Sequence, residues 1–553
     1  MMKDLQNKIQ QAIQTALKQD VVVVLSRPEP EFGDLATNVA LQIAKQLGKN
    51  PREVAEMLVE ALRNDLKDEI REVTIAGPGF INIRLSESRL LAYLTEVTDA
   101  PKDLAGKQIV AEYSDPNPFK VLHAGHLYTS IVGDAISNLL ETAGGTVHRV
   151  NFGGDVGLHV GKTLWAILQN LGGEYPDKLA NIPEAERAEW MARCYISGTN
   201  AFEDDPAAKQ QIIALNKQVY DFHSANDKDS PLAQIYWTTR QWSYDYFDAF
   251  YERIGSAFEK YYPESTVADL GLQTVKSHIQ AGIFEESDGA IVFRGEPHGL
   301  HTRVFINKEG LPTYEAKDVG LIMQKFEDYH FDKSVVITGN EQEQYMAVVL
   351  KAIEQFEPEL VRATSHLTHG MVKLKGGVKM SSRKGNILRA VDVLEAAQNA
   401  NSRADEYVTL GAVKYAFLKV RTGGDIIYDP KESVSIEGNS GPYLQYAHAR
   451  ARSVLRKATT KSQAPAHLED NERQLVIKLT EYRDVLGRAV EELAPHIVCT
   501  YLYELAQIFN RFYEKNRVIA DPREAERLYL IDVYTNVLNN GLSILGIHAP
   551  DTM

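Results

Sequence analysis

The hydrophobic pattern changes twice along the 553 residues, and this change limits the possible folds more than any other feature. In the middle of the chain, short β-rich runs at residues 108–113 and 146–152 flank a helix that we expect at 127–143. Such alternation favours a parallel α/β sheet. It returns at residues 333–338, followed by a helix that contains 345–356. We therefore predict one α/β domain whose two halves are separated by an insertion.

The two ends of the chain have different patterns. Two amphipathic stretches at 5–17 and 51–66, with a strand–turn–strand pattern at 73–85, indicate a small α+β domain. Near the other end, apolar residues at helical spacing predict an all-α bundle; they form three faces, at 475–493, 501–512 and 528–545. The predicted domains are 1–100, 101–435 and 436–553, with a polar, mostly helical insertion at about 171–231.

Composition excludes several classes of protein. With 44% hydrophobic and 24% charged residues, the chain resembles an ordinary soluble globular protein. Its apolar runs are too short to span a bilayer, and the N-terminus shows no secretory signal, so we expect a cytoplasmic protein without membrane association. Two cysteines, Cys194 and Cys499, exclude a four-cysteine zinc site. The net charge of −15 argues mildly against a nucleic-acid partner.

The first motif that suggests chemistry is PNPFKVLHAGH at residues 116–126, between a predicted strand and a predicted helix. Helix N-termini bind phosphate through free N–H groups, and the imidazoles of His123 and His126 would add donors. Gly125 would let an adenine ring approach the backbone closely. The alternative is a pair of surface or capping histidines. A helical zinc-protease site is excluded, because its histidines are four residues apart and accompanied by a glutamate.

The second motif is a basic run at residues 371–389, which contains six basic residues and no acidic one. Flanking glycines suggest a mobile loop, and mobile cations suit a nucleotidyl-transfer transition state, where charge develops on oxygens. Taken alone, a solvated charge run is the more common explanation. The two motifs together, on opposite halves of one α/β domain, favour the catalytic interpretation. The basic residues are Lys373, Lys375, Lys379, Arg383, Lys384 and Arg389.

These motifs, HAGH and KMSSR, resemble the HIGH and KMSKS signatures of class I aminoacyl-tRNA synthetases. Further stretches narrow the resemblance to the arginyl-tRNA synthetase family: NFGGDVGLHVGK at 151–162, TYEAKDVG at 313–320 and GPYLQYAHARARSVLRK at 441–457. The family implies a Rossmann-like catalytic domain with a parallel sheet, an N-terminal domain that binds the tRNA elbow, and a helical anticodon-binding domain. The implied reaction activates L-arginine with ATP to arginyl-adenylate and then transfers the arginyl group to the terminal adenosine of tRNA(Arg).

The resemblance also implies roles for matching residues, with ATP and Mg²⁺ in the reaction and no structural zinc. One departure is Ser382, which replaces the second lysine of KMSKS, so which neighbouring cation acts is left open. The implied catalytic residues are His123, His126, Lys379, Arg383 and Lys384. The implied ATP-binding residues are Lys120, Gly125, His369, Gly370, Met371 and Ser381.

A guanidinium presents a planar fork of donors, so its pocket needs carboxylates and favours an aromatic wall. Asp318 and Tyr314 lie one helical turn apart and can face the same side. By resemblance, arginine is bound by Glu112, Asn117, Glu264, Tyr314, Asp318 and Gln342. For each acidic residue taken singly, a helix cap or a surface position is the usual alternative.

Contacts with tRNA are expected in two places. Residues 438–468 contain five basic residues and no acid, interleaved with aromatic rings. Phe80 and Asn82 follow a Gly-Pro-Gly turn in the N-terminal domain, although core packing is an equal alternative for Phe80. The expected tRNA-binding residues are Phe80, Asn82, Tyr443, Tyr446, Arg450 and Arg452. We expect a monomer.

Two other functions are compatible with part of the pattern. A nucleotidylyltransferase shares the HxGH motif but lacks a helical C-terminal domain with YAHAR. A non-catalytic tRNA-binding paralogue would keep the fold, although intact His123, His126, Lys379 and Asp318 argue against it. The charge distribution favours an RNA partner, because the segments 371–389 and 438–468 are free of acids in an acidic chain.

Overall fold

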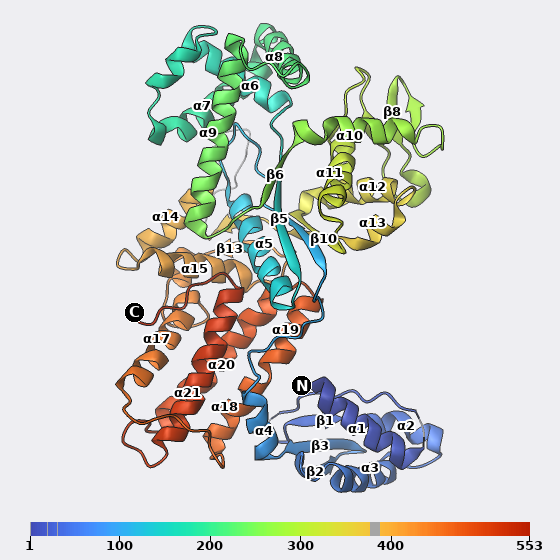
Figure 1. Ribbon diagram of the computed structural model, residues 1–553, viewed down its shortest axis with the longest axis vertical. Helices are drawn as coiled ribbons and strands as arrows, with labels where there is room; N and C mark the ends of the chain where they lie inside the picture. Colours follow the sequence, from blue (N-terminus) through green and yellow to red (C-terminus); the bar gives the residue numbers. More distant parts are fainter. Residues whose placement is uncertain (1, 19, 30, 376–387) are drawn as a thin grey trace. The chain divides into compact units, whose positions relative to one another are not determined.

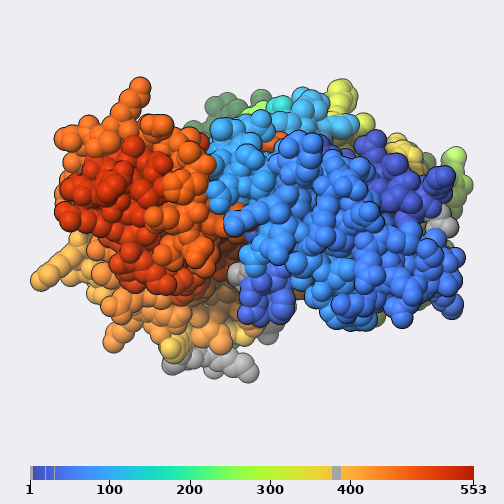
Figure 2. Space-filling view, turned by 90° about the horizontal axis from the view of Figure 1, so that it is seen from below, coloured from blue at the N-terminus to red at the C-terminus, as the bar shows by residue number. Residues whose placement is uncertain are grey.

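The computed structural model describes residues 2–18, 20–29, 31–375 and 388–553. The chain divides into two compact units. The first contains Met1–Pro101, Tyr443–Ile544 and His548–Met553, and the second contains Lys102–Pro442 and Leu545–Ile547. In the space-filling view the N-terminal part of the first unit is blue, and its helical part runs from orange to red (Figure 2). None of the described helices is long and apolar enough to cross a membrane.

The N-terminal domain is the predicted α+β fold. Its three strands form an antiparallel sheet in the order β1 (Leu35–Thr37), β3 (Phe80–Leu85), β2 (Ile70–Ala76). Pro51 starts a helix because its missing N–H is not needed there, and the Asn50 side chain accepts a hydrogen bond from the Arg52 N–H at 3.0 Å. The helices are α1 (Met2–Leu17), α2 (Val39–Leu47), α3 (Pro51–Asp65) and α4 (Glu87–Leu94).

The second unit is built on the predicted parallel sheet. Its five strands run in the order β11 (Thr364–His369), β10 (Lys333–Gly339), β4 (Gln108–Glu112), β5 (Thr146–Gly153), β6 (Lys260–Pro263). Every neighbouring pair is parallel. Helix α5 (Ala124–Thr142) follows β4 and packs beside the sheet (Figure 1). The chain adds strands on one side of β4 and later on the other, so the strand order reverses between β4 and β10.

The insertion is helical and has a core of its own; it spans residues 158–254, beyond the expected 171–231. Helix α6 (Leu158–Leu171) packs against α7 (Arg187–Asp204) and α8 (Pro206–Ser224), and α9 (Pro231–Ile254) leads back to β6 (Figure 1). Leu164, Ile167, Val219 and Tyr236 are completely buried in this core. The insertion is therefore a packed subdomain rather than a long loop.

Helix α10 (Glu264–Ser277) begins directly after β6 and packs very closely against α11 (Tyr314–Tyr329). A Cβ atom on Gly271 would lie 1.9 Å from the Ala316 carbonyl oxygen, and one on Gly320 would lie 2.2 Å from that of Val267. Only glycine allows this approach. Between the two helices in sequence lies a small antiparallel sheet of β7 (Glu285–Ser287), β8 (Ala290–Phe293) and β9 (Arg303–Ile306).

The rest of the second unit surrounds the sheet. The 3-10 turn η4 (Asn340–Gln342), α12 (Glu343–Glu354) and α13 (Pro358–Ala363) join β10 to β11. After β11, the short strands β12 (Val372–Leu374) and β13 (Ile426–Tyr428) pair in parallel. The remaining helices are α14 (Ala390–Ala400), α15 (Glu406–Leu418) and α16 (Pro430–Ser433).

The C-terminal part is the predicted all-α bundle, with one difference. The face expected at 475–493 is shared by two helices, because the Glu481 N–H bonds to the Lys478 carbonyl, three residues back rather than four, and breaks the helix there. The helices are α17 (Gly441–Lys457), α18 (Asp470–Thr480), α19 (Tyr482–Glu491), α20 (Pro495–Lys515) and α21 (Glu524–Ile544).

Candidate active site at the carboxyl ends of the strands

Residues expected to bind arginine or ATP gather at one edge of the parallel sheet. Asn117 follows β4, Glu264 follows β6, Gln342 follows β10, and His369 ends β11. In open α/β sheets, ligands bind beyond the carboxyl ends of the strands, where the strand order reverses. Here that place lies between β4 and β10.

The HAGH turn forms the start of α5, and its two histidines cap the helix. His123 Nδ1 accepts a hydrogen bond from the Gly125 N–H, and His126 Nδ1 accepts one from the His123 N–H, each at 3.1 Å. The rings stack with centroids 3.8 Å apart. Burial, and then the Lys120 cation, lower the pKa of His123 to about 4. Burial likewise lowers the pKa of His126 well below its ordinary value.

The histidine tautomers follow from these bonds. Each Nδ1 is an acceptor, and each ring is neutral near pH 7, so the ring proton must be on Nε2. Both rings can therefore donate from Nε2. The capping interpretation and the catalytic one are compatible, because the cap uses one nitrogen of each ring and leaves the other available.

The segments that follow β11 are held against the HAGH turn. The His369 Nε2 and Thr129 Oγ1 atoms lie 2.7 Å apart, and His369 Nδ1 donates to the Gly370 carbonyl. The backbone on either side of Arg389 also pairs with the turn: the Ala124 N–H donates to the Leu388 carbonyl at 2.8 Å. The end of the basic run is therefore anchored to the first motif.

The three acidic residues expected in the arginine pocket are all buried. Glu112, Glu264 and Asp318 are 2%, 3% and 7% exposed. Lys325 pairs with Glu112, Lys317 pairs with Glu264, and Asp318 instead accepts a hydrogen bond from the Tyr345 hydroxyl. Burial raises the pKa of Asp318 to about 7, and the hydrogen bond from the Tyr345 hydroxyl partly opposes this rise. Of the three, Asp318 is the carboxylate without an ion pair among the described residues.

Residues of the 151–162 motif hold this pocket together. The Gly154 N–H donates to Asn117 Oδ1 at 2.8 Å, and a Cβ on Gly154 would lie 2.9 Å from Glu264 Oε1. Asp155 is completely buried and accepts hydrogen bonds from the Ser265 N–H at 3.0 Å and the Ser265 hydroxyl at 2.7 Å. The 151–162 motif therefore holds Asn117 and Ser265 in place around the Glu264 carboxylate.

Other expected site residues have more open surroundings. Tyr314 is 56% exposed, and its ring centroid lies 5.2 Å from Lys317 Nζ. Gln342 is exposed on η4. Lys120 Nζ lies 5.1 Å from the ring centroid of Tyr195 on α7.

Three cations of the basic run at 371–389 form ion pairs with acidic residues outside the run. Lys373 pairs with Asp425 at 2.5 Å, Lys375 pairs with Asp429 at 2.8 Å, and Arg389 with the nearby Asp392 at 2.6 Å. The predicted mobile loop and four predicted functional residues lie outside the described residues. These four are Lys379, Ser381, Arg383 and Lys384.

Comparison with known proteins identifies the fold and the family together. Residues 90–429, more than half of the chain, match the family model for the catalytic domain of "tRNA synthetases class I (R)". The chain belongs to the class I arginyl-tRNA synthetase family. Residues 3–85 match the arginyl-tRNA synthetase N-terminal domain, and residues 444–553 match the DALR anticodon-binding domain. These matches confirm the predicted family and its ligase class, and they exclude the nucleotidylyltransferase alternative.

Individual relatives agree with this membership. The arginine–tRNA ligase of Bdellovibrio bacteriovorus is 30% identical, and the match covers 96% of this chain and 94% of the relative. That of Picosynechococcus sp. is also 30% identical, over 97% and 96% of the two chains. The structure of Thermus thermophilus arginyl-tRNA synthetase superposes with a TM-score of 0.79 at 25% identity and covers 100% of both chains.

The residues expected to contact tRNA in this synthetase lie in the first unit. Phe80 is the first residue of β3 and is 43% exposed, so it is not a core residue, whereas Asn82 is 7% exposed. On α17, Tyr446 is 40% exposed. Tyr443 and Arg450 both bond to Asn510, and Arg452 pairs with Asp551 at 2.9 Å.

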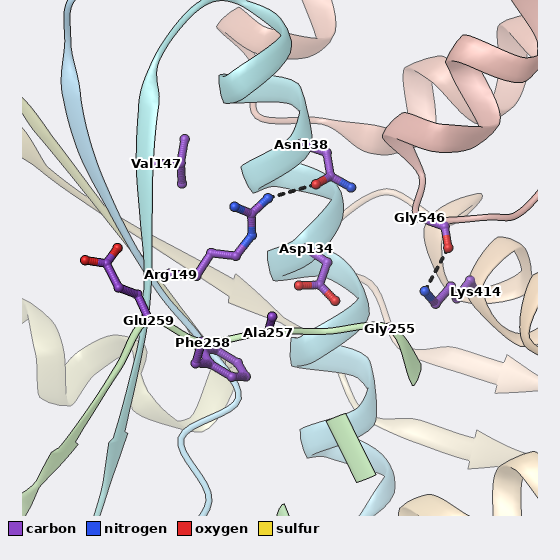
Figure 3. A pocket seen from close by; sticks show the side chains of 10 residues that line it. All are labelled: Asp134, Asn138, Val147, Arg149, Gly255, Ala257, Phe258, Glu259, Lys414 and Gly546. Atoms are coloured by element: carbon purple, nitrogen blue, oxygen red, sulfur yellow. Dashed lines mark hydrogen bonds between the residues drawn. The ribbon is translucent and has the colours of Figure 1, made fainter. Parts of the chain in front are cut away.

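A cavity of about 440 Å³ opens at the other end of the sheet, away from this site. Figure 3 shows Asp134 and Asn138 of α5, Arg149 of β5 and Lys414 of α15 around it. Arg149 donates to Asn138 at 2.9 Å, and Lys414 donates to the Gly546 carbonyl at 2.8 Å.

Sequence reasoning missed several residues that shape the synthetase site. Lys317 and Lys325 stand inside or just after the TYEAKDVG stretch, but their partners are 53 and 213 residues away. Asp155 lies in a motif that was recognised only as a family signature. Charge balance was the signal that could have found Lys317 and Lys325, because the acidic residues assigned to the arginine pocket outnumber the basic residues assigned to it.

Proposed function

We propose that this arginine–tRNA ligase performs both steps of its reaction in the crevice at the carboxyl ends of β4 and β10. The observation that carries the proposal is the meeting, at this edge, of the HAGH turn, the pocket carboxylates and the end of the basic run. In the first step the substrate carboxylate attacks the α-phosphate and pyrophosphate leaves. The carboxylate is itself the nucleophile, so the enzyme mainly has to position the substrates and stabilise charge.

ATP is the substrate bound by the HAGH side of the crevice. The Nε2–H groups of His123 and His126 donate to phosphate oxygens, and Lys120 adds a cation. His369, Gly370 and Met371 provide the backbone against which adenine lies. A Cβ on Gly370 would lie 2.4 Å from the Gly424 backbone, so only glycine lets this segment pack against the chain at residues 424–425.

The proposal extends to residues outside the described ones. Lys379, Arg383 and Lys384 stabilise the transition state, and Ser381 contributes to ATP binding. Mg²⁺ enters as the ATP complex, because this ion keeps near-octahedral coordination that substrate phosphates and water complete.

Arginine is bound through both of its ends. Asp318 and Glu264 receive the guanidinium, with Tyr314 as a wall, because carboxylates match its fork of donors. Asn117, Glu112 and Gln342 bind the α-amino and carboxylate end. The Lys325 partner of Glu112 holds that carboxylate in place.

tRNA(Arg) is bound by the other parts of the chain. We assign residues 1–100 to the tRNA elbow, 101–435 to catalysis and 436–553 to the anticodon stem-loop. Exposed Phe80 and Tyr446 offer rings for base stacking, and Asn82, Tyr443, Arg450 and Arg452 lie beside them in sequence. The enzyme acts as a monomer in the cytoplasm.

The test is exchange of labelled pyrophosphate into ATP with each amino acid in turn, with and without tRNA. Exchange with arginine and no other amino acid is expected. Exchange with a different amino acid alone would contradict the arginine assignment. A complete lack of exchange with arginine, even in the presence of tRNA, would support the non-catalytic paralogue. Sedimentation of the full chain, alone and with tRNA, tests the monomer.

A further inference from the structure

The buried Lys317 forms an ion pair with Glu264, one of the two carboxylates that we assign to the substrate guanidinium. Lys317 Nζ donates to Glu264 Oε2 at 2.7 Å and to the Tyr220 hydroxyl at 3.2 Å. The side chains of Lys317 and Glu264 are each 4% exposed. Burial lowers the pKa of Lys317, but the Glu264 carboxylate outweighs this and raises it above its ordinary value. Lys317 is therefore a permanent cation in the pocket.

The backbone keeps this pair together. Helix α10 carries Glu264 and helix α11 carries Lys317, and the glycine contacts at Gly271 and Gly320 hold the two helices at the closest possible distance. Asp155 fixes the residue after Glu264 through its N–H and hydroxyl bonds with Ser265. Glu264 therefore cannot move away from Lys317 without disturbing the packing of two helices.

The two pocket carboxylates consequently differ in charge balance. Glu264 is neutralised by Lys317, and its Oε1 atom has no hydrogen-bond donor among the described residues. The Asp318 carboxylate has only the Tyr345 hydroxyl on its Oδ2 atom within the described part of the chain. An arriving guanidinium therefore meets two different carboxylates. Asp318 has no ion-pair partner among the described residues, whereas Glu264 offers one acceptor oxygen beside the fixed ammonium of Lys317.

We propose that Lys317, held by Tyr220 of the insertion, is a positioning residue that determines specificity: it fixes and neutralises Glu264, so that the pocket accepts a spread, forked cation and rejects a compact one. The inference rests on the proposed arginine pocket. A guanidinium spreads its charge over a plane and reaches both carboxylates, whereas a lysine ammonium is a compact, strongly hydrated point charge. Repulsion from Lys317 therefore acts more strongly on lysine, and such a repulsive element contributes to discrimination.

Other charged groups face the same carboxylates. Around Asp318 these are Glu112, Lys325, Glu264 and Tyr345. The carboxyl group of Asp115, after β4, also faces the Glu112 and Asp318 carboxylates; burial, and then their negative charges, raise its pKa. Around Glu264 they are Lys317, Asp155 and Lys120. With Lys317 present, burial raises the pKa of Asp318 to about 7. Burial also raises the pKa of Glu264, and removal of Lys317 takes away the cation that opposes this rise.

The experiment compares four variants of the full chain with the wild type in the presence of tRNA. K317M removes the charge, K317R keeps it, and Y220F removes the hydroxyl that holds the ammonium. K276M is the matched control, because Lys276 is an exposed lysine on the last turn of α10. The measurements are kcat and KM for arginine, lysine and ATP, repeated between pH 6 and 8.5, with circular-dichroism melting of each variant.

For K317M we expect at least a tenfold rise in the KM for arginine and at least a tenfold rise in the lysine-to-arginine ratio of kcat/KM, with the KM for ATP within twofold. The wild-type KM for arginine should rise up to tenfold per pH unit below about pH 7, and more steeply in K317M. K317R and K276M should stay within threefold of wild type, and Y220F should shift the ratio about threefold.

An unchanged lysine-to-arginine ratio and an unchanged pH slope in a folded K317M would overturn the proposal. If K317M does not fold, Y220F decides: a ratio equal to that of K276M overturns the proposal, and a threefold shift supports it. A wild-type enzyme that does not use arginine would instead refute the proposed function, so the two failures are distinguishable.

Discussion

The two ends of the parallel sheet both carry buried charges, but they differ in what those charges leave unpaired. At the amino ends of the strands, Asp134 is 8% exposed and accepts hydrogen bonds from the Tyr113 hydroxyl at 2.6 Å and from the Ser256 hydroxyl. Arg149 is held by Asn138 and Glu141, and Lys414 by a backbone carbonyl. These charged groups all have fixed partners.

The carboxyl ends are different. Glu264 and Asp318 each keep one oxygen without a donor among the described residues, and His123 and His126 keep their Nε2–H groups. The cavity of about 440 Å³ lies at the amino ends, whereas the two buried carboxylates that keep an unpaired oxygen among the described residues lie at the carboxyl ends. Neither buried charge nor cavity volume identifies this site; the unpaired carboxylate oxygens do.

The largest effect is expected from D318A. Truncating one partner of a buried, hydrogen-bonded charge pair costs about 4 kcal/mol, or roughly a thousandfold. We therefore expect kcat/KM for arginine to fall by about three orders of magnitude, while the fold persists. Steady-state charging kinetics measure this, with D328A, which removes an exposed acid nearly three turns further along α11, as the control. Near-normal kinetics would remove Asp318 from the pocket.

A smaller loss is expected from H126A. Its Nε2–H is a preorganised donor to charge that develops on phosphate oxygens, and loss of one such donor costs about 10²-fold in kcat. ATP–pyrophosphate exchange at saturating arginine measures it. If H126A exchanges at the wild-type rate, the Nε2 assignment is wrong.

At the opposite end of the sheet, D134A should hardly affect catalysis. Its removal leaves the buried cation of Lys414 and the Tyr113 hydroxyl without their acidic neighbour, so we expect a loss of about 3 kcal/mol in the free energy of unfolding. The kcat/KM for arginine at 25 °C should stay within about threefold, since the sites are separate and effects of distant sites are independent. A hundredfold loss of kcat/KM for arginine in folded D134A would contradict the functional difference between the two ends of the sheet.

The smallest change concerns pH. Because burial lowers the pKa of His123 to about 4, this ring is already neutral at pH 6 and gains no further neutral fraction as the pH rises. The KM for ATP should therefore vary by less than about twofold between pH 6 and 8. A titration near 6.5 in the KM for ATP, absent from H123N, would show that the ring is solvated and normally basic.

Local pattern explains which parts of this structure were predictable. Periodicity located strands β4, β5 and β10, helix α5 and the helices at both ends of the chain, but not the sheet strands β6 and β11. Motif context placed His123 and His126 at a helix start. The break at Glu481 was missed because a single 3-10 bond leaves the apolar spacing unchanged. Lys317 and Tyr220 were missed because the contacts of Lys317 with Glu264 and Tyr220 depend on how closely two helices and the insertion pack, which no local pattern records.

The bonds of Asp155 have a consequence for protein engineering. This carboxylate joins Arg240 of α9 to Ser265 at the start of α10, at 3.0 Å and 2.7 Å. A trimmed catalytic core that omits the insertion, or a chimera that imports one from a relative, would lose or alter both Arg240 and Tyr220. Such a graft would change amino-acid selection as well as stability, unless these two side chains were transplanted with their partners.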